Sequence, residues 1–344
     1  MKTNELAETA RALTAEGKGL LAMDESTPTC NKRFERYGIP QTVEARRSYR
    51  ELLLTTPGLS GSISGVILYD ETIRQSKKNG TPFLRLIADA GMIAGIKVDA
   101  GAKEAAGFPG EKITEGLDGL RDRLKEYARL GALFAKWRAV ISIGAGLPTW
   151  GCVAANASAL ARYAALCQEA RLVPIVEPEV IMEGDHTLER CAEATEYALR
   201  TVFAALYSQR VALEGMILKP NMILPGNACI KQDGVEAVAD ATVECLFRAV
   251  PAAVPGVAFL SGGQSPELAT ERLNAMNARH KSRAPWALTF SFSRALQQPV
   301  LEAWKGRDSS AGAAQQALHH RARCNRAARN GRYSSAMERE PAVR

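Results

Sequence analysis

The chain has 344 residues, of which 46% are hydrophobic and 24% charged, so it can bury a core of ordinary globular size. No apolar run reaches the length of a membrane span, and the first residues lack the basic-then-apolar order of a signal peptide. Seven cysteines without paired spacing indicate reduced thiols in a cytoplasm rather than a disulfide framework or a zinc site.

Short aliphatic or β-branched runs alternate along the chain with stretches of helical periodicity. The runs predicted to be strands are Gly19–Met23, Gly65–Tyr69, Gly95–Val98, Ala132–Ile141, Leu172–Pro178, Gly215–Leu218, Gly256–Leu260 and Trp286–Phe290. The stretches between them that are predicted to be helices include Leu117–Leu130, Ala154–Ala170, Leu188–Leu213, Asp233–Val250 and Pro266–Ala278.

This alternation favours parallel pairing in a sheet that is covered on both faces. Eight such strands predict an α/β fold, a single-domain (β/α)8 TIM barrel over residues 1–330. The alternative is an open doubly wound sheet. It would need a glycine-rich fingerprint after the first strand, where the sequence instead reads Met23-Asp24-Glu25-Ser26-Thr27.

The carboxyl-terminal segment carries most of the net charge of +7, because nine Lys or Arg residues face three Asp or Glu residues from Lys305 onward. Its arginines lack interleaved aromatic residues and do not keep to one helical face. We therefore expect a basic, solvated helix rather than a specific nucleic-acid or membrane surface. Residues 331–344 have no apolar period and are predicted to form a mobile tail. The arginines concerned are Arg321, Arg323, Arg326, Arg329 and Arg332.

The four histidines do not predict a metal site. His186 and His280 are far apart in the sequence, and the adjacent His319 and His320 would point in different directions on a helix. We therefore expect neither a metal nor another cofactor.

Charged residues stand at the carboxyl ends of five predicted strands. Side chains two positions apart on a strand share a face, and a closed barrel brings its strand ends to one mouth, where the active site of such folds lies. One charged pair would be an ordinary solvated loop junction, but five converging strands indicate an active site. These residues are Asp24, Lys97 with Asp99, Lys136 with Arg138, Glu177 with Glu179, and Lys219.

Lys219 lies inside the apolar run Met216–Leu224. Burial disfavours an ammonium and lowers its pKa, and a neutral amine is a nucleophile toward carbonyl groups. Taken alone, a lysine that reaches solvent from a strand end is the commoner interpretation. The other converging charged residues favour the nucleophile.

The last two strands end in small polar residues. Ser261-Gly262-Gly263 follows one strand, and the other runs through Ser291 to Arg294. Loops in these two positions of a barrel often bind phosphate, through backbone N–H groups and a bidentate arginine. An amine, two carboxylates and an anchored phosphate together suit Schiff-base catalysis on a phosphorylated carbonyl compound.

These motifs resemble those of class I fructose-1,6-bisphosphate aldolases, the metal-independent Schiff-base type. The similar segments follow the family order over roughly residues 5 to 333, and the family fold agrees with the barrel argued above. They are Gly19–Thr27, Gly95–Asp99, Lys136–Arg138, Val173–Glu179, Leu218–Met222, Phe259–Gln264 and Trp286–Ser291.

The resemblance implies reversible cleavage of fructose 1,6-bisphosphate to dihydroxyacetone phosphate and glyceraldehyde 3-phosphate, in glycolysis or gluconeogenesis, by a cytoplasmic homotetramer without a cofactor. It makes Lys219 the imine-forming lysine and Glu177 the principal general acid/base, with Glu179 close to the lysine. Lys136 is then the cation that polarises substrate oxygen, and Asp24 the carboxylate that takes the C4 hydroxyl proton.

The resemblance also divides the phosphate-binding residues into two groups. Ser261, Gly262, Gly263, Ser291 and Arg294 match the site for the C1 phosphate, whereas Arg33, Ser26, Lys97 and Arg138 match residues near the other phosphate.

The sequence departs from the family pattern at Pro28, Thr29, Ser293 and the carboxyl terminus. Ser293 replaces a glycine that is usual before the phosphate-binding arginine, and Thr29 stands where serine is common. Many animal members end in a tyrosine, but this chain ends in Arg344 and its last tyrosine is Tyr333.

Three alternatives remain. A metal-dependent aldolase would need a histidine cluster. A different Schiff-base barrel could act on a keto acid or on another phosphosugar, such as sedoheptulose 1,7-bisphosphate. A non-catalytic scaffold could bind through the basic tail, but it would have no need for the charged strand ends.

Overall fold

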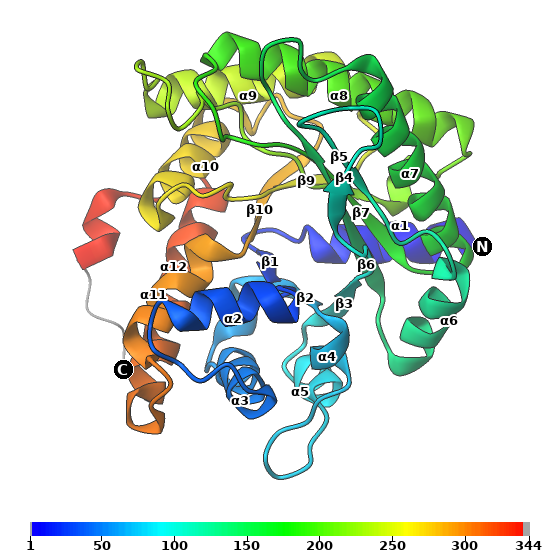
Figure 1. The fold of residues 1–344 in the computed structure, drawn as a ribbon. Helices are drawn as coiled ribbons and strands as arrows, with labels where there is room; N and C mark the ends of the chain where they lie inside the picture. The colour runs from blue at the N-terminus through cyan, green and yellow to red at the C-terminus, as the bar shows by residue number, and fades with distance from the viewer. Residues whose placement is uncertain (1, 340–344) are drawn as a thin grey trace.

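The computed structural model describes residues 2–339, in which eight parallel strands close into a barrel surrounded by helices (Figure 1). The barrel strands are β1 (Gly19–Ala22), β2 (Ile63–Leu68), β3 (Ile93–Lys97), β6 (Phe134–Ile141), β7 (Val173–Val180), β8 (Ile217–Leu218), β9 (Gly256–Phe259) and β10 (Ala287–Phe292). Neighbours in the barrel follow the chain order, and β10 pairs with β1 to close the ring. The predicted (β/α)8 barrel is confirmed, and the open sheet is excluded.

Twelve α-helices and a small hairpin complete the described chain. Thr42, Thr149, Thr187 and Ser265 each cap a helix by accepting a hydrogen bond from the backbone N–H three residues later. The helices are α1 (Lys2–Leu13), α2 (Thr27–Glu35), α3 (Val43–Leu54), α4 (Asp70–Ile73), α5 (Phe83–Asp89), α6 (Leu120–Leu130), α7 (Trp150–Glu169), α8 (Leu188–Ser208), α9 (Val235–Ala249), α10 (Pro266–His280), α11 (Arg294–Trp304) and α12 (Ala311–Arg329). The hairpin pairs β4 (Ala102–Glu104) with β5 (Lys112–Thr114).

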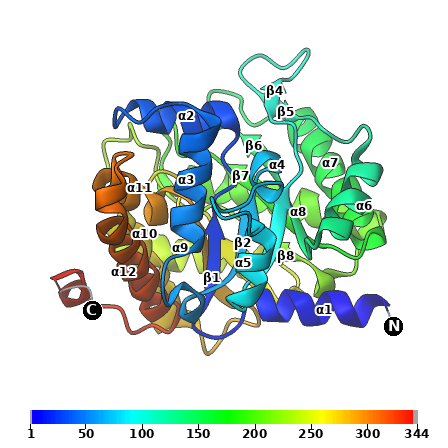
Figure 2. The same cartoon turned by 90° about the horizontal axis from the view of Figure 1, so that it is seen from below.

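The barrel has two different ends. Helix α1 lies across one end, and its Leu6, Ala10 and Leu13 pack against the side chains that fill the barrel interior. The β4–β5 hairpin and α2 lie at the opposite end (Figure 2). Helix α1 therefore covers the end opposite to the carboxyl ends of the strands, where the active site of such barrels lies.

Glycines allow close packing at two barrel positions. A Cβ atom on Gly95 would lie 2.2 Å from the Phe134 ring, and one on Gly19 would lie 2.6 Å from the Phe290 ring. Phe134 and Phe290 are both fully buried. Small residues on these strands thus make room for the aromatic rings of their neighbours.

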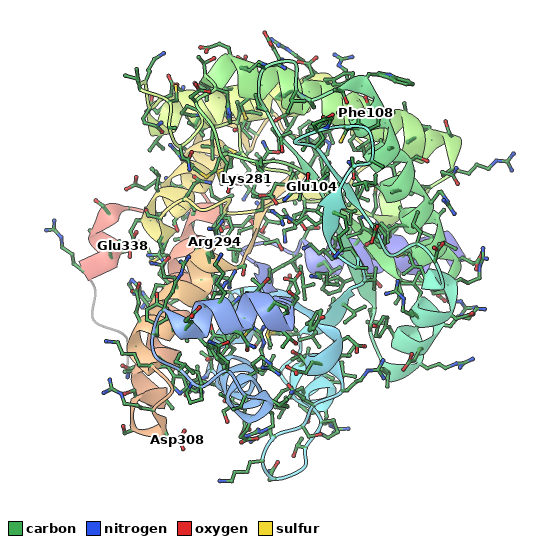
Figure 3. All side chains as sticks on the ribbon, in the orientation of Figure 1. Glu104, Phe108, Lys281, Arg294, Asp308 and Glu338 are labelled. Carbon is green, nitrogen blue, oxygen red and sulfur yellow. The ribbon has the colours of Figure 1, made fainter. Side chains whose placement is uncertain are left out.

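Helix α12 is less solvated than the sequence predicted. Arg321 and Arg329 are buried, with exposed fractions of 3% and 5%. Arg321 binds Glu338 of the following short 3-10 helix (Ser335–Arg339), which lies at the edge of the molecule (Figure 3). The expectation of a solvated basic helix is therefore wrong at these two arginines, because the partners that the fold supplies were not visible in the sequence. Arg321 donates to the Glu338 carboxylate and the Pro266 carbonyl, and Arg329 donates to Oδ1 of Asn277.

The predicted mobile tail is described only in part. In residues 331–339, Tyr333 and Glu338 form a hydrogen bond of 2.7 Å, and Glu338 pairs with Arg321. Residues 340–344 lie outside the described residues, and a boundary at residue 330 stays a prediction. None of the helices within residues 2–339 is long and apolar enough to cross a membrane.

Candidate active site

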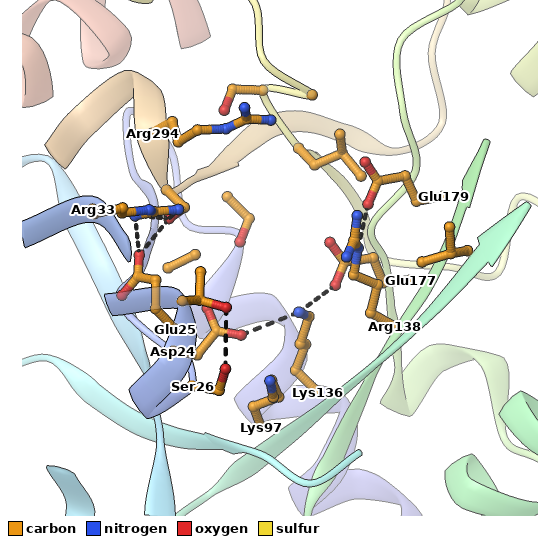
Figure 4. Close-up of a pocket in the computed structure, with 18 of the residues that line it drawn as sticks. Asp24, Glu25, Ser26, Arg33, Lys97, Lys136, Arg138, Glu177, Glu179 and Arg294 are labelled. Carbon is orange, nitrogen blue, oxygen red and sulfur yellow. Dashed lines mark hydrogen bonds and ion pairs between the residues drawn. The ribbon is translucent and has the colours of Figure 1, made fainter. Parts of the chain in front are cut away.

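A cavity of about 580 Å³ lies at the carboxyl ends of the barrel strands (Figure 4). Every predicted site residue lines it except Gly263, which is next to the lining residue Gly262 in the chain. The convergence that the sequence predicted at the strand ends is therefore present in the fold. Its cause is the parallel register, which places Arg138 beside Glu177 and Val176 beside Leu218.

Lys219 follows β8 directly and is almost completely buried, with a side-chain exposure of 4%. Its backbone N–H donates to the Val176 carbonyl at 2.8 Å, which fixes the residue beside β7. The Nζ atom lies 3.2 Å from Oε1 of Glu177. Burial lowers the pKa of Lys219, and the nearby Lys136 ammonium lowers it further against the attraction of Glu177.

Lys136 has the opposite electrostatic environment. Its Nζ atom lies 2.7 Å from Oε2 of Glu177 and 3.1 Å from Oδ2 of Asp24. Burial would lower the pKa of Lys136, but these two carboxylates raise it well above its ordinary value. Lys219 therefore loses its proton more readily than Lys136 does.

Two carboxylates complete this centre. Burial alone would raise the pKa of Glu177, but Lys136 and Lys219 lower it. Burial would likewise raise the pKa of Asp24, which Lys136, Lys219 and Lys97 together lower. Both groups are therefore ionised at neutral pH and can accept a proton.

Glu179 forms its ion pair with a residue other than Lys219. Among the described residues Lys219 forms its ion pair with Glu177 and none with Glu179. Glu179 instead pairs with Arg138, which stands one strand away on β6. The closeness of Glu179 to the lysine stays a prediction, and the Arg138 guanidinium holds its carboxylate.

One side of the cavity offers polar groups that lack protein partners. Arg294 has no ion pair to a carboxylate within residues 2–339, and its pKa is lowered by burial and by the nearby Arg33. The Ser291 hydroxyl is buried without a hydrogen-bond partner. A Cβ atom on Gly263, whose φ is +89°, would lie 3.0 Å from a terminal nitrogen of Arg294. These groups suit an anion from outside the protein.

The other side carries cations that already have carboxylate neighbours. Arg33 on α2 pairs with Glu25, and Lys97 lies 3.9 Å from Asp99 and 5.5 Å from the centre of the Tyr69 ring. Ser26 forms a 3.1 Å hydrogen bond with Thr29. A second anion here would bind to cations that the protein has already oriented.

Two of the cavity residues that were not predicted to be part of the site bind Arg33. Glu25 is buried, and Arg33 and Arg50 bind its carboxylate. Burial would raise the pKa of Glu25, but the two arginines lower it to about 2. Ser293 was noted only as a departure from a family glycine, yet its hydroxyl donates to Glu25 at 2.6 Å. The adjacency of Glu25 to Asp24 was the one available signal for Glu25.

A second cluster lies far from the cavity lining. His320, Cys324 and Glu338 place possible ligand atoms within 4.8 Å of one another. The Glu338 carboxylate also receives hydrogen bonds from Arg321 and Tyr333, so these partners explain its position. The sequence argument considered only the pair of histidines and overlooked this grouping. The expected absence of a metal stays a prediction.

Comparison with known proteins places this geometry in a family. Residues 5–343 match the family model described as fructose-bisphosphate aldolase class-I. The chain belongs to the class I fructose-bisphosphate aldolases. Its activity is that of this family, and the enzyme is a lyase.

Relatives match over nearly the full chain. A probable class 1 fructose-bisphosphate aldolase of Xanthomonas campestris pv. campestris is 57% identical over 97% of this chain and 99% of its own. The cytosolic fructose-bisphosphate aldolase 6 of Arabidopsis thaliana is 49% identical over 96% and 92%. A solved structure of the Plasmodium falciparum fructose-bisphosphate aldolase, in complex with TRAP and a small-molecule inhibitor, is 47% identical. It aligns with a TM-score of 0.95 and covers 97% of this chain and 96% of that chain.

Proposed function

We propose that Lys219 forms the covalent intermediate of this aldolase. Its neutral amine attacks the C2 carbonyl of fructose 1,6-bisphosphate, and loss of water from the carbinolamine gives a protonated imine. The observation that supports this choice is the contrast between two buried lysines, one with a lowered pKa and one with a raised pKa. Among the lysines of residues 2–339, Lys219 alone combines burial with a lowered pKa.

Glu177 is the principal acid/base in this proposal. Its carboxylate contacts both Lys219 and Lys136, so it can carry a proton to the carbinolamine hydroxyl as water leaves. Asp24 or Glu177 then takes the C4 hydroxyl proton, the C3–C4 bond breaks, and glyceraldehyde 3-phosphate departs. The remaining enamine is protonated, and hydrolysis releases dihydroxyacetone phosphate and the free lysine.

The two phosphates bind at opposite sides of the cavity in this proposal. The C1 phosphate takes the partnerless groups of Ser291 and Arg294, with the Ser261, Gly262 and Gly263 turn beside them. The other phosphate lies near the paired cations, which are Arg33, Lys97 and Arg138, together with Ser26. Glu179 acts by orienting Arg138.

Reductive trapping tests the covalent step. Borohydride reduction in the presence of dihydroxyacetone phosphate should label Lys219, as mapped by peptide mass spectrometry. Lys219→Met should abolish both labelling and turnover and leave the circular dichroism spectrum unchanged. Lys136→Met is the matched control, because it also removes a buried lysine side chain, but Lys219 should still be labelled. Substantial turnover by Lys219→Met would exclude the proposed mechanism.

Substrate preference, assembly and location complete the proposal. Two separate cationic sides favour a bisphosphate, and kcat/KM measured for mono- and bisphosphates, including sedoheptulose 1,7-bisphosphate, tests this preference. We expect a homotetramer and a cytoplasmic location, supported by the family resemblance and by Arabidopsis relatives that are named cytosolic. Analytical ultracentrifugation tests the assembly.

A further inference from the structure

Ser293 stands directly before helix α11 but does not cap it. A serine in this position usually accepts a hydrogen bond from a backbone N–H in the first turn of its helix. Ser293 has φ −106° and ψ −80°, and its side chain makes no capping hydrogen bond. The side chain is directed to other partners, so its role lies outside the stability of its own helix.

The hydroxyl of Ser293 joins two other parts of the chain. It donates to Oε1 of Glu25 at 2.6 Å and accepts from both terminal nitrogens of Arg33, at 3.2 Å each. Glu25 follows β1 and Arg33 lies on α2, so one oxygen atom connects three segments at the barrel mouth.

Gln297, one turn further along α11, holds the same group in place. It is fully buried, and its Nε2 atom donates to the Ala22 carbonyl at 2.6 Å and to Glu25 at 2.7 Å. The same nitrogen lies 3.2 Å from the Ser293 hydroxyl. The acceptors of Arg33 are therefore rigid, because a buried amide and the end of a barrel strand support them.

We propose that Ser293 is a positioning residue for substrate specificity, whose hydroxyl fixes the Arg33 guanidinium at the second phosphate. The inference depends on the proposed function, which assigns Arg33 to that phosphate. Without the hydroxyl, Glu25 alone would hold the guanidinium, which could then rotate about this single ion pair. A fixed guanidinium binds an anion without the entropy loss of being ordered at that moment.

The position of Arg33 sets the span between the two phosphate sites. Arg294, the residue after Ser293, serves the C1 phosphate, and it is close enough to Arg33 for the two charges to interact. Ser293 therefore links the backbone next to Arg294, the ligand of the C1 phosphate, to the side chain of Arg33, the ligand of the second phosphate. The enzyme should favour ketoses that carry two phosphates over those with the C1 phosphate alone.

Ser293→Ala tests this inference because it removes only the hydroxyl. KM for fructose 1,6-bisphosphate should rise about 3–10-fold, the size expected for one or two lost hydrogen bonds. KM for fructose 1-phosphate and both kcat values should stay within about twofold. Ser293→Thr retains a hydroxyl and should restore the preference. Ser265→Ala removes a serine that does cap its helix, and it should leave the ratio of the two KM values unchanged.

A double mutant decides whether Ser293 acts through Arg33. In an Arg33→Ala background, Ser293→Ala should raise KM for the bisphosphate no further, because the two changes affect one interaction. Additive effects, or equal effects on both substrates, would overturn the inference, as would no effect on either. Reductive trapping with dihydroxyacetone phosphate, which lacks the second phosphate, should remain normal in Ser293→Ala. Failure of trapping in the wild-type enzyme would instead refute the proposed function.

Discussion

Glu25 should stabilise this enzyme by an amount that depends on pH. The carboxyl group is buried, and Arg33 and Arg50 lower its pKa from 4.5 to about 2. A group whose pKa is lowered by folding stabilises the native state above the pKa of the unfolded chain. That stabilisation is lost as the pH falls toward the native pKa.

The size of this contribution follows from the two pKa values. A difference of about 2.5 pKa units, at about 1.4 kcal/mol each, corresponds to about 3 kcal/mol at pH 7. The same relation leaves about 1.4 kcal/mol at pH 3 and almost nothing below pH 2. Glu25→Gln should therefore lower the free energy of unfolding by about 3 kcal/mol at pH 7, which agrees with the usual cost of breaking a buried ion pair.

Urea unfolding followed by circular dichroism at pH 7, 5 and 3 measures this effect. The difference between wild type and Glu25→Gln should shrink as the pH falls, and most of the loss should occur below pH 4.5. Glu104→Gln is the matched control, because Glu104 lies exposed on the β4–β5 hairpin (Figure 3). A pH-independent difference for Glu25→Gln would show that its charge is not what stabilises the fold.

Three further changes test other parts of the site and fold. Lys136→Met removes the cation that helps lower the pKa of Lys219, so the pH profile of reductive trapping should move to higher pH; an unmoved profile would mean that the lysines are not coupled. Arg294→Ala should raise KM for the bisphosphate about 10–100-fold in steady-state assays with little change in kcat, and an unchanged KM would exclude its role in binding. Gly95→Ala should lower the free energy of unfolding, measured by urea titration, by about 1–3 kcal/mol, because the new Cβ overlaps the Phe134 ring; wild-type stability would contradict that packing.

The sequence was sufficient to locate the barrel and its charged mouth. Charged residues end the apolar strands at their carboxyl ends. Because the strands are parallel, these ends meet at one mouth of the barrel. One helix boundary was predicted wrongly: α7 begins at Trp150, four residues earlier than predicted. The reason is that Thr149 caps the helix at that point. The sequence did not predict the helices α1 to α5 or α11, nor the short β4–β5 hairpin.

What the sequence could not reveal depends on contacts between distant residues. Ser293 and Glu25 are 268 positions apart, and local pattern alone would have assigned the serine to its own helix. By sequence pattern, Arg321 is one of several arginines of a solvated helix, but in the fold it binds Glu338. In each case a polar side chain forms a hydrogen bond with a partner that only the folded chain brings near.

The choice of nucleophile shows how the fold determines chemistry that residue type cannot. Lys136 and Lys219 are both buried at the barrel mouth, and both contact the carboxylate of Glu177. Lys136 has a second carboxylate, Asp24, on its other side, whereas Lys219 faces the Lys136 ammonium. One additional negative charge therefore raises the pKa of Lys136, and the resulting positive charge helps to lower the pKa of Lys219. In the proposed mechanism the pair works as a unit, since the cation that polarises the substrate also activates the amine that attacks it.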